Sequence, residues 1–307
     1  MTIQRVAALI NPSARHGLAG EASDAAVEAL TAAGLEVTPL LGASADEALE
    51  LARTAQTSDH DAVVVVGGDG TIRLALQAVY EAGVDALPIG LMPAGTGNDT
   101  ARALGIPIDD HPAAAAIIAG GARRLCDTAT ITLADGSIHA FGTVAATGLD
   151  ALVTERANTL PWPKGQLRYP IAAVIELARM KPFPYEISVD GQHMERDLVL
   201  ASVGNTASYG GGMQITPAAL IDDGHLDVIL VHHGSRLKLM GMFPTIYSGK
   251  HIHRKEVEQL RGRRIELRSS RTTPIYADGD RIGELPAVIE VRPGAVSFLA
   301  SAALGGE

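Results

Sequence analysis

The chain has little cysteine, a deficit of positive charge and no long apolar run. One of its 307 residues is cysteine, Cys126, which excludes intrachain disulfides and a cysteine-based metal cluster and fits a reducing, cytoplasmic compartment. Lys and Arg number 25 against 35 Asp and Glu, a net charge of −10. That balance argues against nucleic acid as the main partner, because phosphate backbones are bound by basic surfaces. No run reaches the roughly 18 apolar residues that a transmembrane helix needs.

What the chain does have is a globular composition, with 47% hydrophobic residues. Its length predicts about two domains. We place the first at residues 1–129 and the second at 130–300, followed by a tail, 301–307, that packs back on the first. The opening residues, MTIQRVAALINP, predict a strand that runs into a turn rather than a signal peptide.

The two parts differ in their pattern. Up to about residue 129, short apolar strands alternate with helices, which predicts a doubly wound, mostly parallel α/β domain. One of these helices opens with a capping box, Ser44-x-x-Glu47. From residue 130, short alternating runs are separated by Asp-Gly and Pro turns, which predicts an antiparallel, β-sandwich-like domain with two helices, at about 169–180 and 235–248.

The stretch Asp61–Tyr80 organises the first domain. It contains four consecutive valines, Val63–Val66, and such a β-branched run suits a strand buried on both faces. The glycines of Gly67-Gly68-Asp69-Gly70-Thr71 then permit a sharp turn and close approach of a ligand. Apolar residues at helical spacing follow, so free N–H groups and the positive end of a helix dipole converge on an anion site.

Asp69 is the informative residue of that turn. A carboxylate among phosphates repels them unless a cation lies between, so Asp69 predicts Mg²⁺, held directly or through water. The alternative is an ordinary tight turn, since a glycine-rich turn after a strand is by itself a weak signal. The turn matches neither GxGxxG nor GxxxxGK[ST].

A second loop of the same kind is Pro93–Arg102, PAGTGNDTAR, after the strand that ends at Leu91. On its own it reads as an N-capped helix, with Asn98 and Asp99 as ordinary caps. Two such loops after successive strands of a parallel sheet would converge on one pocket at the carboxyl ends of the strands.

Seven motifs occur in the order seen in one known family: Asn11-Pro12, GGDGT at 67–71, PAGTGND at 93–99, Gly148–Ala151, the run Asn205…Gly210–Gly212…Pro217, Asp223-Gly224-x-Leu226-Asp227, and Asp278-Gly279-Asp280. Together they resemble the soluble lipid kinases of the diacylglycerol kinase catalytic-domain type, which include sphingosine kinases. The resemblance covers nearly the whole chain. GGDGT alone is shared with NAD kinases, whereas its combination with PxGTxND and a late DG[DE] is highly specific.

The resemblance implies an ATP-dependent kinase with its active site in the cleft between the two domains. It implies ATP and Mg²⁺ as cofactors and a membrane lipid as substrate, with diacylglycerol, converted to phosphatidic acid, as the leading expectation. The enzyme would be cytoplasmic and in peripheral contact with the membrane. Family members are often homodimers, although no segment of this sequence specifies an interface.

The resemblance also assigns residues to roles. Those expected to bind ATP are Asn11, Gly67, Gly68, Asp69, Gly70, Thr71, Gly95, Thr96 and Asn98. Those expected around the Mg²⁺–water network are Asp69, Asp99 and Asp127. A second, structural Mg²⁺ is expected near Asp222, Asp223 and Leu226. The expected catalytic residues are Asp278, the general base, and Asp280, which stands where the family usually has the longer Glu.

Chemistry by itself leads to the same segment but does not choose one residue. Phosphoryl transfer needs a positioned γ-phosphate and an in-line hydroxyl, and a carboxylate can take the hydroxyl proton. The first domain offers no obvious base, whereas the acidic residues of Tyr276–Asp280 in the second are candidates. The alternative is a hairpin turn, the commonest use of Asp-Gly, and only the order of the motifs raises Asp278 above the other Asp-Gly pairs.

Three further features have open interpretations. Residues 250–271 hold eight Lys and Arg against three Glu, which suits anionic lipid head groups and equally a solvated strand face. Trp162, between two prolines, favours a buried anchor over a loop that dips into a membrane. The pairs His232-His233 and His251-x-His253 favour structural or exposed histidines over a metal site.

Two competing functions remain. An NAD kinase shares the GGDGT logic, but no later stretch resembles its NAD-recognition motifs. A nucleotide- or lipid-binding regulator descended from a kinase is the non-enzymatic reading, against which the intact Asp69, Asp99 and Asp278 argue. The sequence does not distinguish diacylglycerol from a sphingoid base, phosphatidylglycerol or a polyprenol.

Overall fold

The computed structural model describes residues 3–10, 19–160, 162 and 168–301. Its first part carries four parallel strands in the order β2 (Glu36–Leu41), β1 (Arg5–Ile10), β3 (Ala62–Gly67), β4 (Ile89–Pro93). Every residue of β3 and β4 is buried, as the valine run predicts for a strand covered on both faces.

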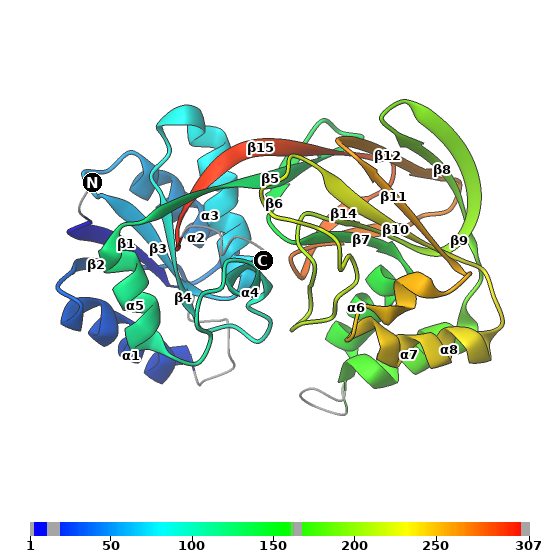
Figure 1. Ribbon diagram of the computed structural model, residues 1–307, viewed down its shortest axis with the longest axis horizontal. Coiled ribbons are helices and arrows are strands. Elements are labelled where there is room, and N and C mark those ends of the chain that lie inside the picture. The colour runs from blue at the N-terminus through cyan, green and yellow to red at the C-terminus, as the bar shows by residue number, and fades with distance from the viewer. Residues whose placement is uncertain (1–2, 11–18, 161, 163–167, 302–307) are drawn as a thin grey trace.

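Helices cover both faces of this parallel sheet. α1 (Ala19–Ala32) packs with α5 (His111–Gly120), and α2 (Ala45–Gln56) packs with α3 (Asp69–Ala82) (Figure 1). The two pairs lie on opposite faces because the crossovers through α1 and α2 run in opposite directions and both are right-handed. The capping box is present, since the Ser44 side chain accepts a hydrogen bond from the N–H of Glu47.

The second part is antiparallel. Its strands are β6 (Ile138–Phe141), β7 (Val144–Gly148), β8 (Phe183–Val189), β9 (Gln192–Gly204), β10 (Leu226–His232), β11 (Val257–Gly262), β12 (Arg264–Ser269), β13 (Pro274–Ala277) and β14 (Asp280–Glu284). They enclose a core of their own, and each of their pairings is antiparallel. The predicted fold class, an α/β domain followed by an antiparallel β-sandwich-like domain, is confirmed.

Three helices lie beside the second sheet: α6 (Leu149–Thr159), α7 (Arg168–Arg179) and α8 (Arg236–Ile246). The sequence predicts α7 and α8 to within two residues at each end. It does not predict α6, which follows directly after β7 and packs on α7 and β13.

Two long strands join the two parts into one continuous sheet. β5 (Arg123–Leu133) and β15 (Ala287–Leu299) pair along nearly their whole length, and Figure 1 shows them arching side by side between the parts. β15 pairs with β12 at its start and with β4, through Phe298 and Ile89, at its end. The boundary at residues 129/130 stays a prediction, and β5 runs across it. Apart from Ser301, the tail lies outside the described residues.

Candidate active site

The two glycine loops lie against each other at the carboxyl ends of β3 and β4. These strands are neighbours, with Gly67 paired to Pro93. A Cβ on Gly95 would lie 2.3 Å from the Cα of Gly68, so backbone meets backbone with no room for a side chain. The amide of Asn98 clasps the second loop, because it accepts from the N–H of Gly95 and donates to its carbonyl, both at 3.0 Å.

This close approach predicts a specific cost. Gly95→Ala should lower the free energy of unfolding by roughly 1–3 kcal/mol, because the added methyl must push two backbones apart. Gly120→Ala is the matched control, since Gly120 ends α5 with open space around it. We expect the control to be neutral or slightly stabilising. Urea unfolding of both variants checks this, and an unchanged midpoint for Gly95→Ala would contradict the contact.

The N-terminus of α3 is open to a ligand. Gly68 is its N-cap, and no described side chain caps the free N–H groups of its first turn. Such a terminus, after a glycine turn, suits a phosphate group. Gly70 and Thr71 belong to that turn, with Thr71 buried beneath Gly67, and Thr96 is exposed on the facing loop. Asn11 lies outside the described residues.

Asp69 bridges the two loops. One of its oxygens accepts from the N–H and hydroxyl of Thr100, at 2.9 and 3.0 Å, and the other accepts from the N–H of Asp99 at 3.1 Å. It therefore caps α4 (Asp99–Ala103), whose first N–H groups would otherwise lack partners.

Asp99 reaches from the first domain into the second. Its carboxylate, 1% exposed, accepts from the Ser208 hydroxyl at 2.7 Å and from the N–H groups of Gly211 and Gly212 at 2.7 and 2.9 Å. These donors belong to the loop between β9 and β10. Asp99 thus pins the glycine-rich loop of the second domain against the second loop of the first.

Asp278 enters the site from the opposite direction, just after β13. The backbone of Asp278 is in the left-handed region, with φ 51°. Its buried carboxylate accepts hydrogen bonds from the N–H of Gly142 and from the N–H and hydroxyl of Thr143. The pKa of Asp278 is raised to about 6, mainly by burial and to a smaller extent by the nearby Asp69 carboxylate, while the bonds from Thr143 and Gly142 oppose the rise.

Asp280 anchors the same turn to the first domain. Its carboxylate accepts from Nε of Arg73, on α3, at 2.9 Å. A Cβ on Gly70 would lie 3.5 Å from the Asp280 carboxylate. The Asp278–Asp280 turn therefore lies over the N-terminal turn of α3, and the structure brings together three motifs that are far apart in the sequence: GGDGT, PAGTGND and DGD.

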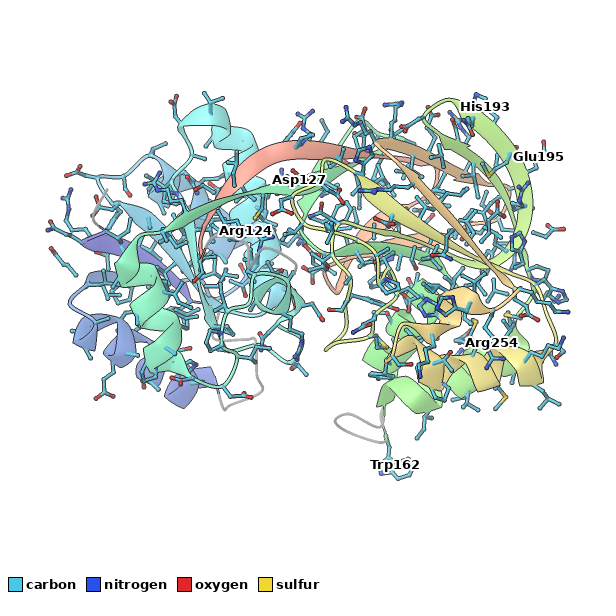
Figure 2. All side chains as sticks on the ribbon, viewed as in Figure 1. Arg124, Asp127, Trp162, His193, Glu195 and Arg254 are labelled. Atoms are coloured by element: carbon cyan, nitrogen blue, oxygen red, sulfur yellow. The ribbon has the colours of Figure 1, made fainter. Side chains whose placement is uncertain are left out.

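Asp127, expected in the Mg²⁺–water network, and the residues expected at a second metal site have other partners. Asp127 accepts from the N–H groups of Gly224 and Gly294 at 2.6 and 2.8 Å. Arg124 binds Asp222 at 2.7 Å. Figure 2 shows Arg124 and Asp127 on β5, between the two parts of the molecule. Asp223 pairs with Arg261, and Leu226 is buried at the start of β10.

The donor set tests whether Mg²⁺ fits. In the part of the chain that the structure describes, no three His, Cys, Asp or Glu side chains converge as a metal cluster. Asp69, Asp99 and Asp127 already accept hydrogen bonds from the protein. A protein cage for Mg²⁺ therefore has no support, whereas an ion held by one or two carboxylates together with phosphates and water, the usual arrangement at nucleotide sites, fits.

Four residues that the sequence did not single out complete the site: Arg73, Thr100, Thr143 and Ser208. Thr100 directly follows the PAGTGND motif, so that adjacency was a usable signal. Thr143 carries no such signal, since it meets Asp278 from 135 positions away. Asn205, quoted above only as part of a motif, donates from its amide to the carbonyls of Asp127 and Gly142, at 3.0 and 2.9 Å, and so steadies the turn that holds Asp278.

A cavity of about 640 Å³ adjoins the second glycine loop on the side of α1 and α5. Gly95 and Asn98 line it together with residues of α1 and of Ile108–Pro112. Its described lining comes from the first domain alone, so it does not include Asp278 or Asp280.

Sequence profiles of two families match the chain. The one described as the diacylglycerol kinase catalytic domain matches residues 5–131, and the one described as the YegS C-terminal NAD kinase beta sandwich-like domain matches residues 142–300. A solved structure of a putative diacylglycerol kinase from Bacillus anthracis has a TM-score of 0.79, with 23% identity and 98% of each chain covered, and so shares the fold.

Curated relatives agree. A diacylglycerol kinase of Mycobacterium tuberculosis is 42% identical over 298 residues, covering 97% of this chain and 95% of the relative. A probable lipid kinase, YegS-like, of Stenotrophomonas maltophilia is 32% identical over 79% of this chain and 80% of the relative. An α/β domain, a β-sandwich-like domain and a carboxylate-lined site between them, together with these relatives, place the chain among the lipid kinases. The chain belongs to the diacylglycerol kinase catalytic-domain family.

Proposed function

We propose that this protein transfers the γ-phosphate of ATP to the hydroxyl of diacylglycerol and so forms phosphatidic acid. One observation carries the proposal. Asp278 of the second domain, a buried carboxylate of raised pKa, lies near the N-terminus of α3, a helix end that suits a phosphate group. The printed names of the relatives, diacylglycerol kinase and lipid kinase, support the choice of acceptor.

The two glycine loops would hold the phosphates of ATP. The free N–H groups at the start of α3 can donate to phosphate oxygens, and the lack of side chains at Gly68 and Gly95 lets the ligand approach the backbone. Bound Mg²⁺ would counter the negative charge of the phosphates. Asp69 and Asp99 lie at the edge of this cradle, both close to Gly97.

Asp278 would act as the general base. As the acceptor hydroxyl oxygen bonds to the γ-phosphorus, its proton passes to Asp278, and the bond from the γ-phosphorus to the bridging oxygen breaks to release ADP. A pKa of about 6 leaves the carboxyl ionised at neutral pH and a better proton acceptor than an ordinary Asp. Asp280 would position the turn through Arg73.

The acceptor lies in a bilayer, so the enzyme would act from the water side as a cytoplasmic, peripherally bound protein. None of the described helices is long and apolar enough to cross a membrane. A homodimer remains a prediction from the resemblance.

Transfer of labelled γ-phosphate tests the proposal. We would supply ATP and Mg²⁺ with diacylglycerol, a sphingoid base, phosphatidylglycerol or a polyprenol in mixed micelles, and NAD as a separate acceptor. We expect labelled phosphatidic acid and no label on NAD. Label on another lipid would correct the substrate, label on NAD would replace the function, and ATP binding without transfer to any acceptor would favour the regulator.

A further inference from the structure

Helix α8 is apolar on two opposite faces. Leu239, Met242 and Ile246 are buried and pack toward the second sheet and α7. The other face exposes Leu237 by 81% and Met240 by 44%. Their spacing continues through exposed Pro244 and Tyr247, so these side chains form one stripe along the helix. A surface helix that faces water normally carries polar residues there.

Two neighbouring segments also expose apolar side chains. Val174 of α7, which packs against α8, is 53% exposed. Trp162, in the connection between α6 and α7, is 76% exposed, and Figure 2 shows it extending beyond the ends of these helices. The buried anchor that the sequence favoured for Trp162 is therefore wrong. Single exposed apolar residues are ordinary, but a contiguous set marks an interaction surface.

Cations without acidic partners surround α8. Arg236 opens the helix, and Lys250, Arg254 and Lys255 follow its C-terminal end, all exposed. None of the ion pairs formed by the described residues involves these four side chains. Two other members of the basic run are paired, Arg261 with Asp223 and Arg264 with Glu290. On a chain of net charge −10, this is a local positive region.

We propose that the exposed stripe of α8, with Val174 and Trp162, inserts shallowly into an anionic lipid bilayer while Arg236, Lys250, Arg254 and Lys255 contact its head groups. An eleven-residue helix is too short to span a bilayer and suits the interface, where Trp also prefers to lie. The inference rests on the proposed function, because a kinase whose acceptor is a membrane lipid must dock before it can reach it.

Charge complementarity selects a bilayer over a second copy of the chain. Two copies joined through this face would bring eight uncompensated cations together, and such like-charge contact is unfavourable. Anionic lipids instead attract basic residues that lie near the membrane surface.

Trp162 is the only tryptophan, so tryptophan emission, excited at a wavelength that tyrosine does not absorb, reports this surface. We would add vesicles of phosphatidylcholine, with or without phosphatidylglycerol, to the full chain in the absence of ATP. We expect a blue shift and quenching by brominated lipid with phosphatidylglycerol vesicles, weakened at roughly 1 M salt, where charges are screened within about 3 Å. Emission unchanged by anionic vesicles would overturn the proposal.

Matched variants distinguish binding through the stripe from nonspecific hydrophobic binding. Leu237→Glu with Met240→Glu should weaken vesicle binding at least tenfold, as measured by co-sedimentation. Val84→Glu replaces a fully exposed apolar residue of the first domain and should bind as the native chain does. Both sites are exposed, so unchanged circular dichroism is expected. Native-like vesicle binding by the double variant, or a native dimer that becomes a monomer in it, would reject the bilayer as occupant.

The two proposals fail separately. Vesicle binding with no phosphate transfer leaves the docking surface standing and rejects the kinase function. If the protein phosphorylates short-chain diacylglycerol in micelles but does not bind anionic vesicles, the docking surface alone is rejected.

Discussion

Asp278→Asn is expected to reduce phosphoryl transfer by roughly 10²–10⁴-fold, the usual contribution of a positioned general base. The substitution keeps the shape of the side chain but removes its ability to accept the hydroxyl proton. The measurement is the rate of labelled phosphate transfer to diacylglycerol at saturating ATP. ATP binding should survive, because the α3 terminus and the glycine loops are unchanged. A variant with native activity would remove Asp278 from the reaction.

The pH dependence gives an independent check. Since burial raises the pKa of Asp278 to about 6, activity should fall by about tenfold per pH unit below that value, as the carboxyl becomes protonated. Asp150 is the control, because burial also raises its pKa to about 6 and its carboxylate accepts from the hydroxyl of Tyr209. Asp150→Asn should keep both the activity and the acid limb. Loss of that limb would assign it to Asp150 instead.

The same shift has a consequence for stability. The folded state holds the Asp278 proton more tightly than the unfolded chain, whose Asp has the ordinary value of 3.8. The favourable contribution is therefore complete below about pH 4 and is lost as the pH rises through about 6. Ionisation of this buried group then costs roughly 3 kcal/mol at neutral pH. The ionised Asp278 carboxylate, which the reaction needs as a base, therefore lowers the stability of the free protein.

Asp99→Ala is expected to lower the free energy of unfolding by about 3 kcal/mol or more. The substitution leaves the Ser208 hydroxyl and the N–H groups of Gly211 and Gly212 without an acceptor, and each orphaned donor costs about 1–3 kcal/mol. Urea unfolding gives the value. The effect should be large because the carboxylate is buried and all three donors come from the other domain.

Ser208→Ala is the comparison for the stability loss of Asp99→Ala. It removes one of the three donors and leaves the carboxylate with the other two, so a loss of about 1 kcal/mol is expected. Equal midpoints for Asp99→Ala and the native chain would show that Asp99 does not hold the domains together, and would return it to the role of an Mg²⁺ ligand that the sequence suggested.

Local order was readable from the sequence. The valine run Val63–Val66 forms a buried parallel strand, the capping box at Ser44 starts a helix, and Gly83 ends α3. These features depend on neighbours within a few positions, where backbone sterics and side-chain periodicity dominate. The order of the motifs was also sufficient to place the chain in its family and to predict two domains of different architecture.

What required the tertiary structure is the set of contacts between distant segments. Thr143 and Asp278 meet because β7 pairs with β13, and Asp99 meets Gly211 because the loop after β9 folds onto the first domain. No local pattern encodes such pairings, since they depend on how whole strands are ordered in the sheet. The return of β15 to β4 is of the same kind.

The same distinction explains the carboxylates. Sequence motifs identify Asp69 and Asp99 as acidic residues in glycine-rich turns, the resemblance adds Asp127, and an acid near phosphates suggests a metal. The folded chain directs backbone N–H groups from other segments at each of them, and hydroxyls at Asp69 and Asp99. A carboxylate accepts from any donor that the fold brings near it. The residue type in the sequence therefore tells that an acid is present, and only the three-dimensional arrangement decides which groups that acid binds.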